Sequence, residues 1–270
     1  MIGTFYINGE PVDGRIPVTD SSVLRGDACF EVLKAYGGEP FGLEEHLDRL
    51  EFSAGALGIP LPPREEISSW VTRSAAEVGD CAVRVVVTRG ASVPGVDDPP
   101  RVIVFAHTWP RPGDTTTLLP VTAPWHAAGA DWDLAGAKVT SYAPNVSASR
   151  RAQSKGFGDA LLLSTDGRML EGPTFAVAWV VDDRLETTSL EMGILDSITR
   201  RMVLDSARNL GVEVVEGFWK LDRLEQASEV LAMSTIREVQ GVTAVGERSF
   251  DPGPVTSRLA EAYEKLTRSI

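Results

Sequence analysis

A proline- and glycine-rich segment near the middle of the chain most restricts how the rest can fold. It reads Thr108-Trp109-Pro110-Arg111-Pro112-Gly113-Asp114. Proline is excluded from helix interiors and central strands, so the segment is typical of a connection between domains. The chain has 270 residues, which is above the usual size of one domain. We therefore expect an N-terminal domain over residues 1–112, a linker over 113–118 and a C-terminal domain over 119–270.

The first part of the chain shows strand-type and helical patterns in turn. Asn8-Gly9 can adopt the positive φ angles of a tight hairpin turn. We expect residues 30–36 to form a strand with Phe30, Val32 and Lys34 on one face and the residues between them on the other. We also expect helices over residues 44–57 and 63–78, and strands over 82–88 and 102–106. Because His46 and Arg49 are three residues apart, the helical pattern makes them neighbours on one helix surface.

The second part of the chain shows the same mixture of patterns. Residues 160–164, a turn at Asp166-Gly167 and residues 176–181 predict a buried hairpin or meander. Gly211 is expected to end the helix that precedes it, since glycine is common just after the last residue of a helix. We expect strands over residues 117–121, 212–215 and 230–233, and helices over 145–155, 197–210 and from about 255 onward.

Composition excludes several classes of partner. The 26 basic and 38 acidic residues give a net charge of -12, which argues against nucleic acid or an anionic membrane as the main partner. The net charge does not exclude a local positive pocket that binds a phosphate. The start of the chain lacks the pattern of a signal peptide, and no apolar run is long enough to cross a bilayer. Cys29 and Cys81 form no metal-binding spacing, which fits a reduced cytoplasm, with a disulfide between them as the alternative.

The stretch from Lys138 to Glu171 contains the side chains with the most suggestive chemistry. Tyr142 follows the lysine by four residues, and Glu171 comes just after an expected strand and turn. An amine can form a Schiff base with a carbonyl cofactor, a phenol can donate to an oxyanion, and a carboxylate can hold a protonated ring nitrogen. Each residue taken alone is more often structural, and a lone lysine is most often a solvated side chain.

A second pointer is the segment from Gly193 to Arg200, which places a turn directly before a helix. The first amides of that helix, at Ile198 and Thr199, have no intrahelical acceptor and could bind a phosphate. An ordinary capped helix start is the more frequent outcome for such a motif. The hydroxyl pair Ser234-Thr235 follows an expected strand and by itself indicates only a turn.

Taken together and in register, these segments resemble the class IV aminotransferases, the pyridoxal phosphate (PLP) enzymes that include branched-chain and D-amino acid aminotransferases and aminodeoxychorismate lyase. The matching runs are Gly26–Glu31, Leu43–Leu50, Lys138–Asn145, Leu170–Gly172, Gly193–Arg200 and Ser234–Val239. The resemblance implies a mixed α/β fold of type IV, with a small N-terminal α/β domain and a larger C-terminal domain containing a barrel-like sheet. It also implies a cofactor between the domains and a homodimer.

The resemblance further implies a role for individual residues. Lys138 would hold PLP as an internal aldimine and move the proton at the substrate α-carbon. Tyr142 would bind the phenolic oxygen of PLP, and Glu171 would pair with its pyridine nitrogen. The phosphate would be bound by Arg49, Ile198, Thr199, Ser234 and Thr235, while Leu195 packs against the ring. Phe30, Val32, Lys34 and Tyr36 would line part of the substrate site. For Arg49 the alternative is a surface salt bridge within its acidic helix.

Two departures from the family pattern bear on the substrate. Ala176 stands where the family often has Asn, and Ala91-Ser92-Val93-Pro94-Gly95 lacks the Arg and His with which many D-amino acid enzymes hold a carboxylate. The leading hypothesis is a cytoplasmic aminotransferase that moves an amino group from an amino acid or primary amine to a 2-oxo acid through pyridoxamine phosphate. The alternatives are aminodeoxychorismate lyase, which forms 4-aminobenzoate and pyruvate, and a scaffold that has lost the cofactor.

Overall fold

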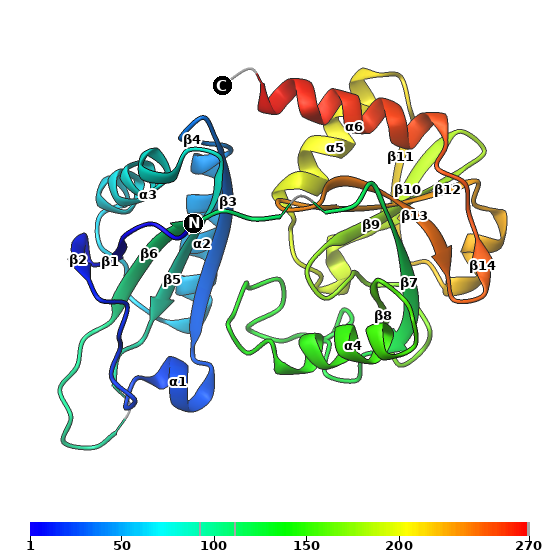
Figure 1. The fold of residues 1–270 in the computed structure, drawn as a ribbon. Helices are drawn as coiled ribbons and strands as arrows, with labels where there is room; N and C mark the ends of the chain where they lie inside the picture. Colours follow the sequence, from blue (N-terminus) through cyan, green and yellow to red (C-terminus); the bar gives the residue numbers. More distant parts are fainter. Residues whose placement is uncertain (92, 111, 269–270) are drawn as a thin grey trace. The chain divides into compact units, whose positions relative to one another are not determined.

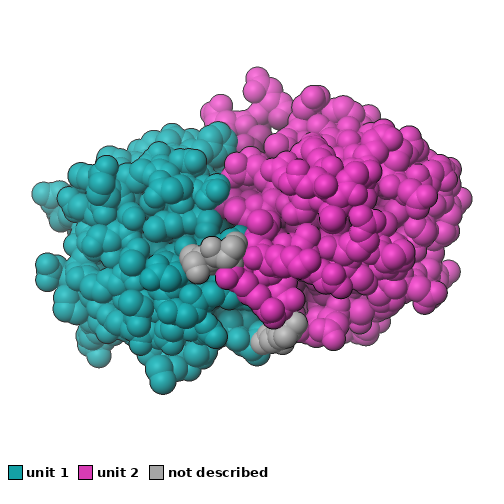
Figure 2. All heavy atoms as spheres, turned by 90° about the horizontal axis from the view of Figure 1, so that it is seen from above, with its two compact units in different colours: residues 1–110, 137–142, 270 teal, residues 111–136, 143–269 magenta. Residues whose placement is uncertain are grey.

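The computed structural model describes residues 1–91, 93–110 and 112–268, and these form two compact units (Figure 2). Unit 1 comprises Met1–Pro110 with Ala137–Tyr142, and unit 2 comprises the described residues within Arg111–Gly136 and Ala143–Ser269. The segment with Lys138 therefore belongs to unit 1. Ser92 of the Ala91–Gly95 segment and Arg111 of the proline-rich segment lie outside the described residues. The domain limits expected from the sequence stay a prediction, because a unit of dense contacts need not be a domain that folds alone.

Unit 1 is a six-stranded antiparallel sheet with two long helices on one face (Figure 1). The strands lie in the order β2-β1-β6-β5-β3-β4. Their bounds are Phe5–Ile7 (β1), Glu10–Val12 (β2), Ala28–Tyr36 (β3), Glu39–Pro40 (β4), Cys81–Thr88 (β5) and Arg101–His107 (β6). The helices are Ser21–Arg25 (α1), Leu43–Leu57 (α2) and Arg64–Val78 (α3). The predicted hairpin is confirmed, since Asn8 and Gly9 both have positive φ between β1 and β2.

The two faces of strand β3 differ in burial. Glu31 and Leu33 are each 1% exposed and lie under the helices, while Phe30 and Val32 on the other face are half-buried. Burying a side chain such as Leu33 contributes about 2 kcal/mol, so this face holds α2 and α3 against the sheet. Both cysteines lie on the buried face as free thiols. The alternative of a disulfide is therefore wrong.

Unit 2 is built on an eight-stranded sheet in the order β11-β10-β9-β12-β13-β7-β8, with β14 paired to β13. The strands are Thr115–Thr122 (β7), Asp159–Leu163 (β8), Ala176–Val181 (β9), Arg184–Thr188 (β10), Val214–Gly217 (β11), Glu229–Ser234 (β12), Glu238–Val245 (β13) and Arg248–Ser249 (β14). The α-helices are Ala143–Ser154 (α4), Ile198–Asn209 (α5) and Pro254–Thr267 (α6). Short 3₁₀ turns cover Leu190–Met192 (η1) and Leu221–Gln226 (η2). Among the described residues, no helix is long and apolar enough to span a membrane.

The expected hairpin between residues 160–164 and 176–181 is wrong. Strand β8 pairs in parallel with β7, whereas β9 lies between β10 and β12. The turn at Asp166-Gly167 is present, and Leu163 forms a single bridge with Met169. Both strands are buried along their whole length. A continuous apolar pattern predicts burial but does not identify the pairing partner, so the sequence could not distinguish these arrangements.

Candidate active site

The predicted site residues fall into two groups, one in each unit. Unit 1 contains Phe30, Val32, Lys34, Tyr36, Arg49, Lys138 and Tyr142. Unit 2 contains Glu171, Leu195, Ile198, Thr199, Ser234 and Thr235.

The backbone of Lys138 is bonded on both sides. Its amide donates to Ser53 Oγ of α2 at 3.0 Å, and its carbonyl accepts from the amide of Phe30 at 3.0 Å. Its neighbour Val139 bridges Cys29, and the amide of Thr140 donates to the Ala28 carbonyl at 2.8 Å. Residues 138–140 thus run alongside the start of β3. These contacts fix the position from which the lysine side chain starts.

Phe30 brings the amine and the phenol of this segment to one aromatic ring. The Nζ atom of Lys138 lies 4.6 Å from the centroid of the Phe30 ring. The ring of Tyr142 packs edge-on against Phe30, with 5.3 Å between centroids. Arg84 of β5 also lies over Phe30, at 5.7 Å, and burial lowers the pKa of its guanidinium. The sequence alone gave no indication of Arg84.

Arg49 is buried and pairs with a strand residue. Its Nε donates to Glu31 Oε1 at 2.7 Å and its Nη2 to Glu31 Oε2 at 2.8 Å. Nδ1 of His46 is 2.7 Å from Glu31 Oε2. Arg49 is only 8% exposed, so the alternative of a surface salt bridge within its own helix is wrong. The predicted adjacency of His46 and Arg49 on α2 is confirmed, because both contact the same carboxylate.

The charge state of this cluster follows from its surroundings. Burial by itself would raise the pKa of Glu31, but the charge and hydrogen bonds of Arg49 and the hydrogen bond of His46 lower it well below its ordinary value. Burial lowers the pKa of His46 against the opposing effect of Glu31. Near pH 7 the glutamate is therefore ionised and the imidazole neutral. An ionised carboxylate can only accept, so Nδ1 of His46 carries the hydrogen.

In unit 2, the carboxylate of Glu171 is held by two neighbours. Its Oε2 accepts from the amide of Leu195 at 3.2 Å, and its Oε1 lies 3.6 Å from Nε2 of His126. Nδ1 of His126 accepts from the amide of Ala128 at 3.0 Å, so a neutral His126 carries its hydrogen on Nε2, toward Glu171. Leu195, predicted to pack against a ring, thus also positions Glu171 through its backbone.

The start of α5 has the geometry of an anion site. Ser197 caps the helix by accepting from the amide of Arg200 at 3.3 Å, while the first two helical amides, at Ile198 and Thr199, have no intrahelical acceptor. Both residues are buried, at 4% and 2% exposure. The hydroxyl of Thr199 hydrogen-bonds to Tyr263, whose pKa burial raises to about 12. Such a helix start can bind a phosphate.

The second hydroxyl pair lies at the end of β12. Ser234 is the last residue of the strand, and its Oγ accepts from the amide of Arg237 at 3.2 Å, which closes the turn that contains Thr235. The sequence predicted this turn correctly. The role of the two hydroxyls in phosphate binding stays a prediction.

Sequence reasoning missed several contacts to the predicted residues. The sequence predicted that His46, three residues before Arg49, is its neighbour on the helix. It did not predict that both residues contact Glu31. His126 and Tyr263 had no local signal, because each meets its partner across a long separation in the chain. Ala176, where the family pattern departs, is the buried first residue of β9 and pairs with Met233.

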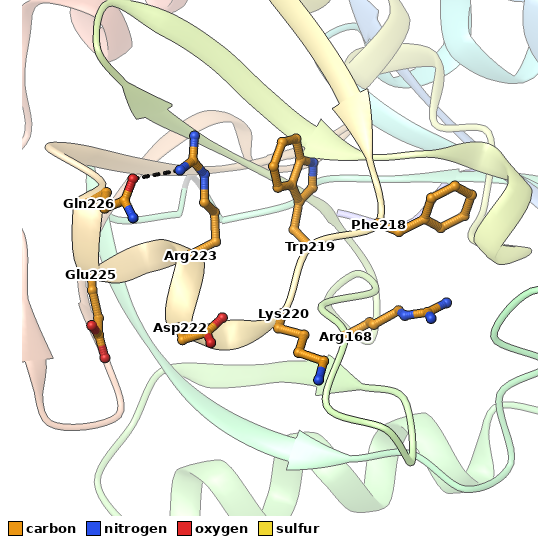
Figure 3. A pocket seen from close by; sticks show the side chains of 8 residues that line it. All are labelled: Arg168, Phe218, Trp219, Lys220, Asp222, Arg223, Glu225 and Gln226. Atoms are coloured by element: carbon orange, nitrogen blue, oxygen red, sulfur yellow. Dashed lines mark hydrogen bonds between the residues drawn. The ribbon is translucent and has the colours of Figure 1, made fainter.

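An open hollow in unit 2 (Figure 3) has no predicted site residue in its lining. It is lined by Arg168, Phe218, Trp219, Lys220, Asp222, Arg223, Glu225 and Gln226. Arg223 donates to Glu186 and to Gln226, the latter at 2.6 Å, and Arg168 pairs with Asp166 at 3.0 Å. Since its arginines are already engaged by acidic or amide partners, we assign no catalytic role to this hollow.

Comparison with known proteins identifies the family. The family model described as amino-transferase class IV matches residues 28–245. The chain belongs to this family. It is 31% identical to a putative branched-chain-amino-acid aminotransferase from Methanocaldococcus jannaschii, over 97% of this chain and 95% of that protein. It is also 27% identical to the aminodeoxychorismate lyase of Bacillus subtilis, over 98% and 95%.

A solved structure extends the likeness to three dimensions. A hypothetical aminotransferase from Mycobacterium tuberculosis, in its PLP-bound form, matches with a TM-score of 0.89 and 26% identity. The match covers 98% of this chain and 99% of that one. The predictions of family, of a mixed α/β fold of type IV and of an enzyme are thereby confirmed. The roles of single residues stay predictions.

Proposed function

We propose that this class IV aminotransferase binds PLP and moves an amino group from an amino acid to a 2-oxo acid, with branched-chain amino acids as the leading donor class. The observation that carries the proposal is the restraint on Lys138, whose backbone is bonded to Ser53 and Phe30 and whose amine lies over the Phe30 ring. The branched-chain relative from Methanocaldococcus jannaschii supports the donor class. The PLP-bound form of the Mycobacterium tuberculosis aminotransferase supports the cofactor.

Each unit contains groups of the kind that the polar atoms of PLP require. A phosphate suits a buried guanidinium such as that of Arg49 and the first amides of α5, at Ile198 and Thr199. Ser234 and Thr235 would add hydroxyl donors. A protonated pyridine nitrogen suits a carboxylate that is held in place, as Glu171 is by Leu195 and His126.

When bound, PLP supplies a cationic ring that accepts the electron pair left as the α-carbon loses its proton. Lys138 would take that proton as a general base and return it as a general acid. Tyr142 would donate a hydrogen bond to the phenolic oxygen, and Glu171 would keep the proton on the ring nitrogen. Each of these groups acts at one atom, so loss of any one of them should affect a different step.

The half-buried face of β3 would form part of the substrate site. Phe30, Val32 and Tyr36 present mostly apolar surface, which suits a branched aliphatic side chain. Lys34 lies over the Tyr36 ring, with its Nζ 5.1 Å from the centroid, and would place a positive charge near a substrate carboxylate.

We also propose assembly as a homodimer, which the family resemblance implies and light scattering would test.

The test is amino transfer from L-leucine, L-isoleucine or L-valine to 2-oxoglutarate, with D-alanine and a chiral amine as comparison donors. We expect transfer from the branched-chain donors with PLP present, and loss of transfer in Lys138→Ala. Transfer that persists in Lys138→Ala would contradict the proposal.

A second candidate function is aminodeoxychorismate lyase activity. It is favoured by the similarity to the Bacillus subtilis lyase along nearly the whole chain. This reaction needs no amino acceptor. If aminodeoxychorismate yields pyruvate and 4-aminobenzoate without a 2-oxo acid, and the branched-chain donors fail, the lyase assignment replaces the first.

A further inference from the structure

We propose that Glu31 is a positioning residue for phosphate recognition, which fixes the guanidinium plane of Arg49 and is itself locked by His46. The inference rests on the proposed role of Arg49 in binding the PLP phosphate, and it assigns a task to two residues that would not touch the cofactor. Glu31 comes from β3, while His46 and Arg49 come from α2.

The contact between Glu31 and Arg49 determines an orientation as well as a distance. Two N–H groups on one edge of the guanidinium meet two different oxygens, with Nε to Oε1 at 2.7 Å and Nη2 to Oε2 at 2.8 Å. Two parallel hydrogen bonds make the guanidinium and carboxylate coplanar. A guanidinium has five N–H groups, so this contact uses two and sets the direction of the other three.

His46 prevents the carboxylate from turning. Its Nδ1 donates to Oε2 at 2.7 Å, so this oxygen accepts from His46 as well as from Nη2 of Arg49. Glu31 is 1% exposed and His46 3% exposed, so water has little access to replace these bonds. Because His46 is one helical turn from Arg49, the same carboxylate also fixes the register of α2 against β3.

Unit 2 contains a similar cluster, in which a buried glutamate accepts from an arginine and from an aromatic ring N–H. This cluster contains no predicted site residue. Glu186 is also 1% exposed, accepts from Nε and Nη2 of Arg223 at 2.8 and 2.5 Å, and accepts from the indole N–H of Trp179 at 3.0 Å. Glu186→Gln therefore removes the same kind of buried carboxylate and serves as a matched control for Glu31→Gln.

The experiment compares binding of PLP and of pyridoxal, which lacks the phosphate, to the full-length apo-protein. Each ligand is titrated and followed by absorbance. We expect Glu31→Gln to weaken PLP binding by roughly tenfold to a hundredfold, the range of one hydrogen bond to a charged group, and to leave pyridoxal binding unchanged. Glu186→Gln should leave the ratio of the two affinities at the wild-type value.

Further variants separate the possible failures. Glu31→Asp keeps the charge but withdraws the carboxylate by one methylene, and it should show the same selective loss if Glu31→Gln does not fold. An affinity ratio that stays at the wild-type value in the Glu31 variants, or an equal loss for both ligands, overturns the inference. If Arg49→Lys also leaves the ratio unchanged, the proposed role of Arg49 fails instead.

Discussion

The Glu31 and Glu186 clusters show how one arrangement of buried charge can serve two purposes. Each places a fully buried glutamate against an arginine fork and an aromatic ring N–H. They differ in what else the arginine's element contacts. Helix α2 also carries Ser53, whose Oγ accepts from the amide of Lys138. Arg223 instead donates to Gln226, and its Cζ lies 5.2 Å from the centroid of the Trp219 ring (Figure 3). A buried ion pair therefore indicates function only through its neighbours.

The largest effect should come from removing the arginines. Arg49→Met leaves the buried carboxylate of Glu31 without its arginine partner, and Arg223→Met leaves that of Glu186 with only Nη2 of Arg184, at 3.9 Å. Each change should cost about 3–5 kcal/mol in the free energy of unfolding. Arg223 should lie at the lower end, because its side chain is 20% exposed and that of Arg49 only 8%. Urea-induced unfolding measures both. Costs below about 1 kcal/mol for both variants would show that water reaches both buried carboxylates.

The next effect concerns the third donor of each cluster. His46→Phe and Trp179→Phe each remove one hydrogen bond to an ionised carboxylate, which contributes about 1.5–3 kcal/mol. Trp179 should lie at the upper end, because it is fully buried and also loses packing volume. Only His46→Phe should also lower the ratio of PLP to pyridoxal affinity. A change of that ratio in Trp179→Phe would remove the distinction between the clusters.

The smallest effect is a difference in pH dependence. The pKa of each glutamate is lowered in the folded protein, so both stabilise the fold above the unfolded pKa of about 4.3 and lose this contribution in more acidic solution. The pKa of His46 is also lowered, so its contribution is present above its unfolded pKa of about 6.5 and declines as the pH falls below it. Trp179 has no titrating group, so only the Glu31 cluster weakens between pH 6.5 and 5.

The measurement for this prediction is the free energy of unfolding at pH 7, 6 and 5 in wild type and His46→Phe. One proton contributes a slope of at most about 1.4 kcal/mol per pH unit. The wild-type slope should exceed that of His46→Phe, and the difference isolates His46 from the two other histidines. Equal slopes would mean that His46 does not titrate differently in the folded and unfolded protein.

The helices and turns that depend on residues close together in the sequence could be predicted from the sequence. The periodicity of residues 44–57 specified α2, and Asn8-Gly9 specified the first hairpin. The pairing of β8 with β7 could not be predicted, because β9 and all of β8 after Asp159 are apolar, and either strand could have occupied the same place in the sheet.

The candidate site divides in the same way. Motifs short enough to be read locally indicated Lys138, Arg49 and the start of α5. The contacts that hold these residues join distant parts of the chain, as in the hydrogen bonds of Glu31 to Arg49 and of Tyr263 to Thr199. A single sequence contains no record of such pairs, because their geometry arises only when strands and helices pack.

Peptide mapping decides whether Lys138 is the residue to which PLP attaches. The protein is incubated with PLP, reduced with borohydride, digested and analysed by mass spectrometry. We expect one phosphopyridoxyl group, on the peptide that contains Lys138, and none on the peptides with Lys34, Lys155, Lys220 or Lys265. A label on another lysine, or no label in a folded wild-type protein, would show that Lys138 is not the residue that holds PLP.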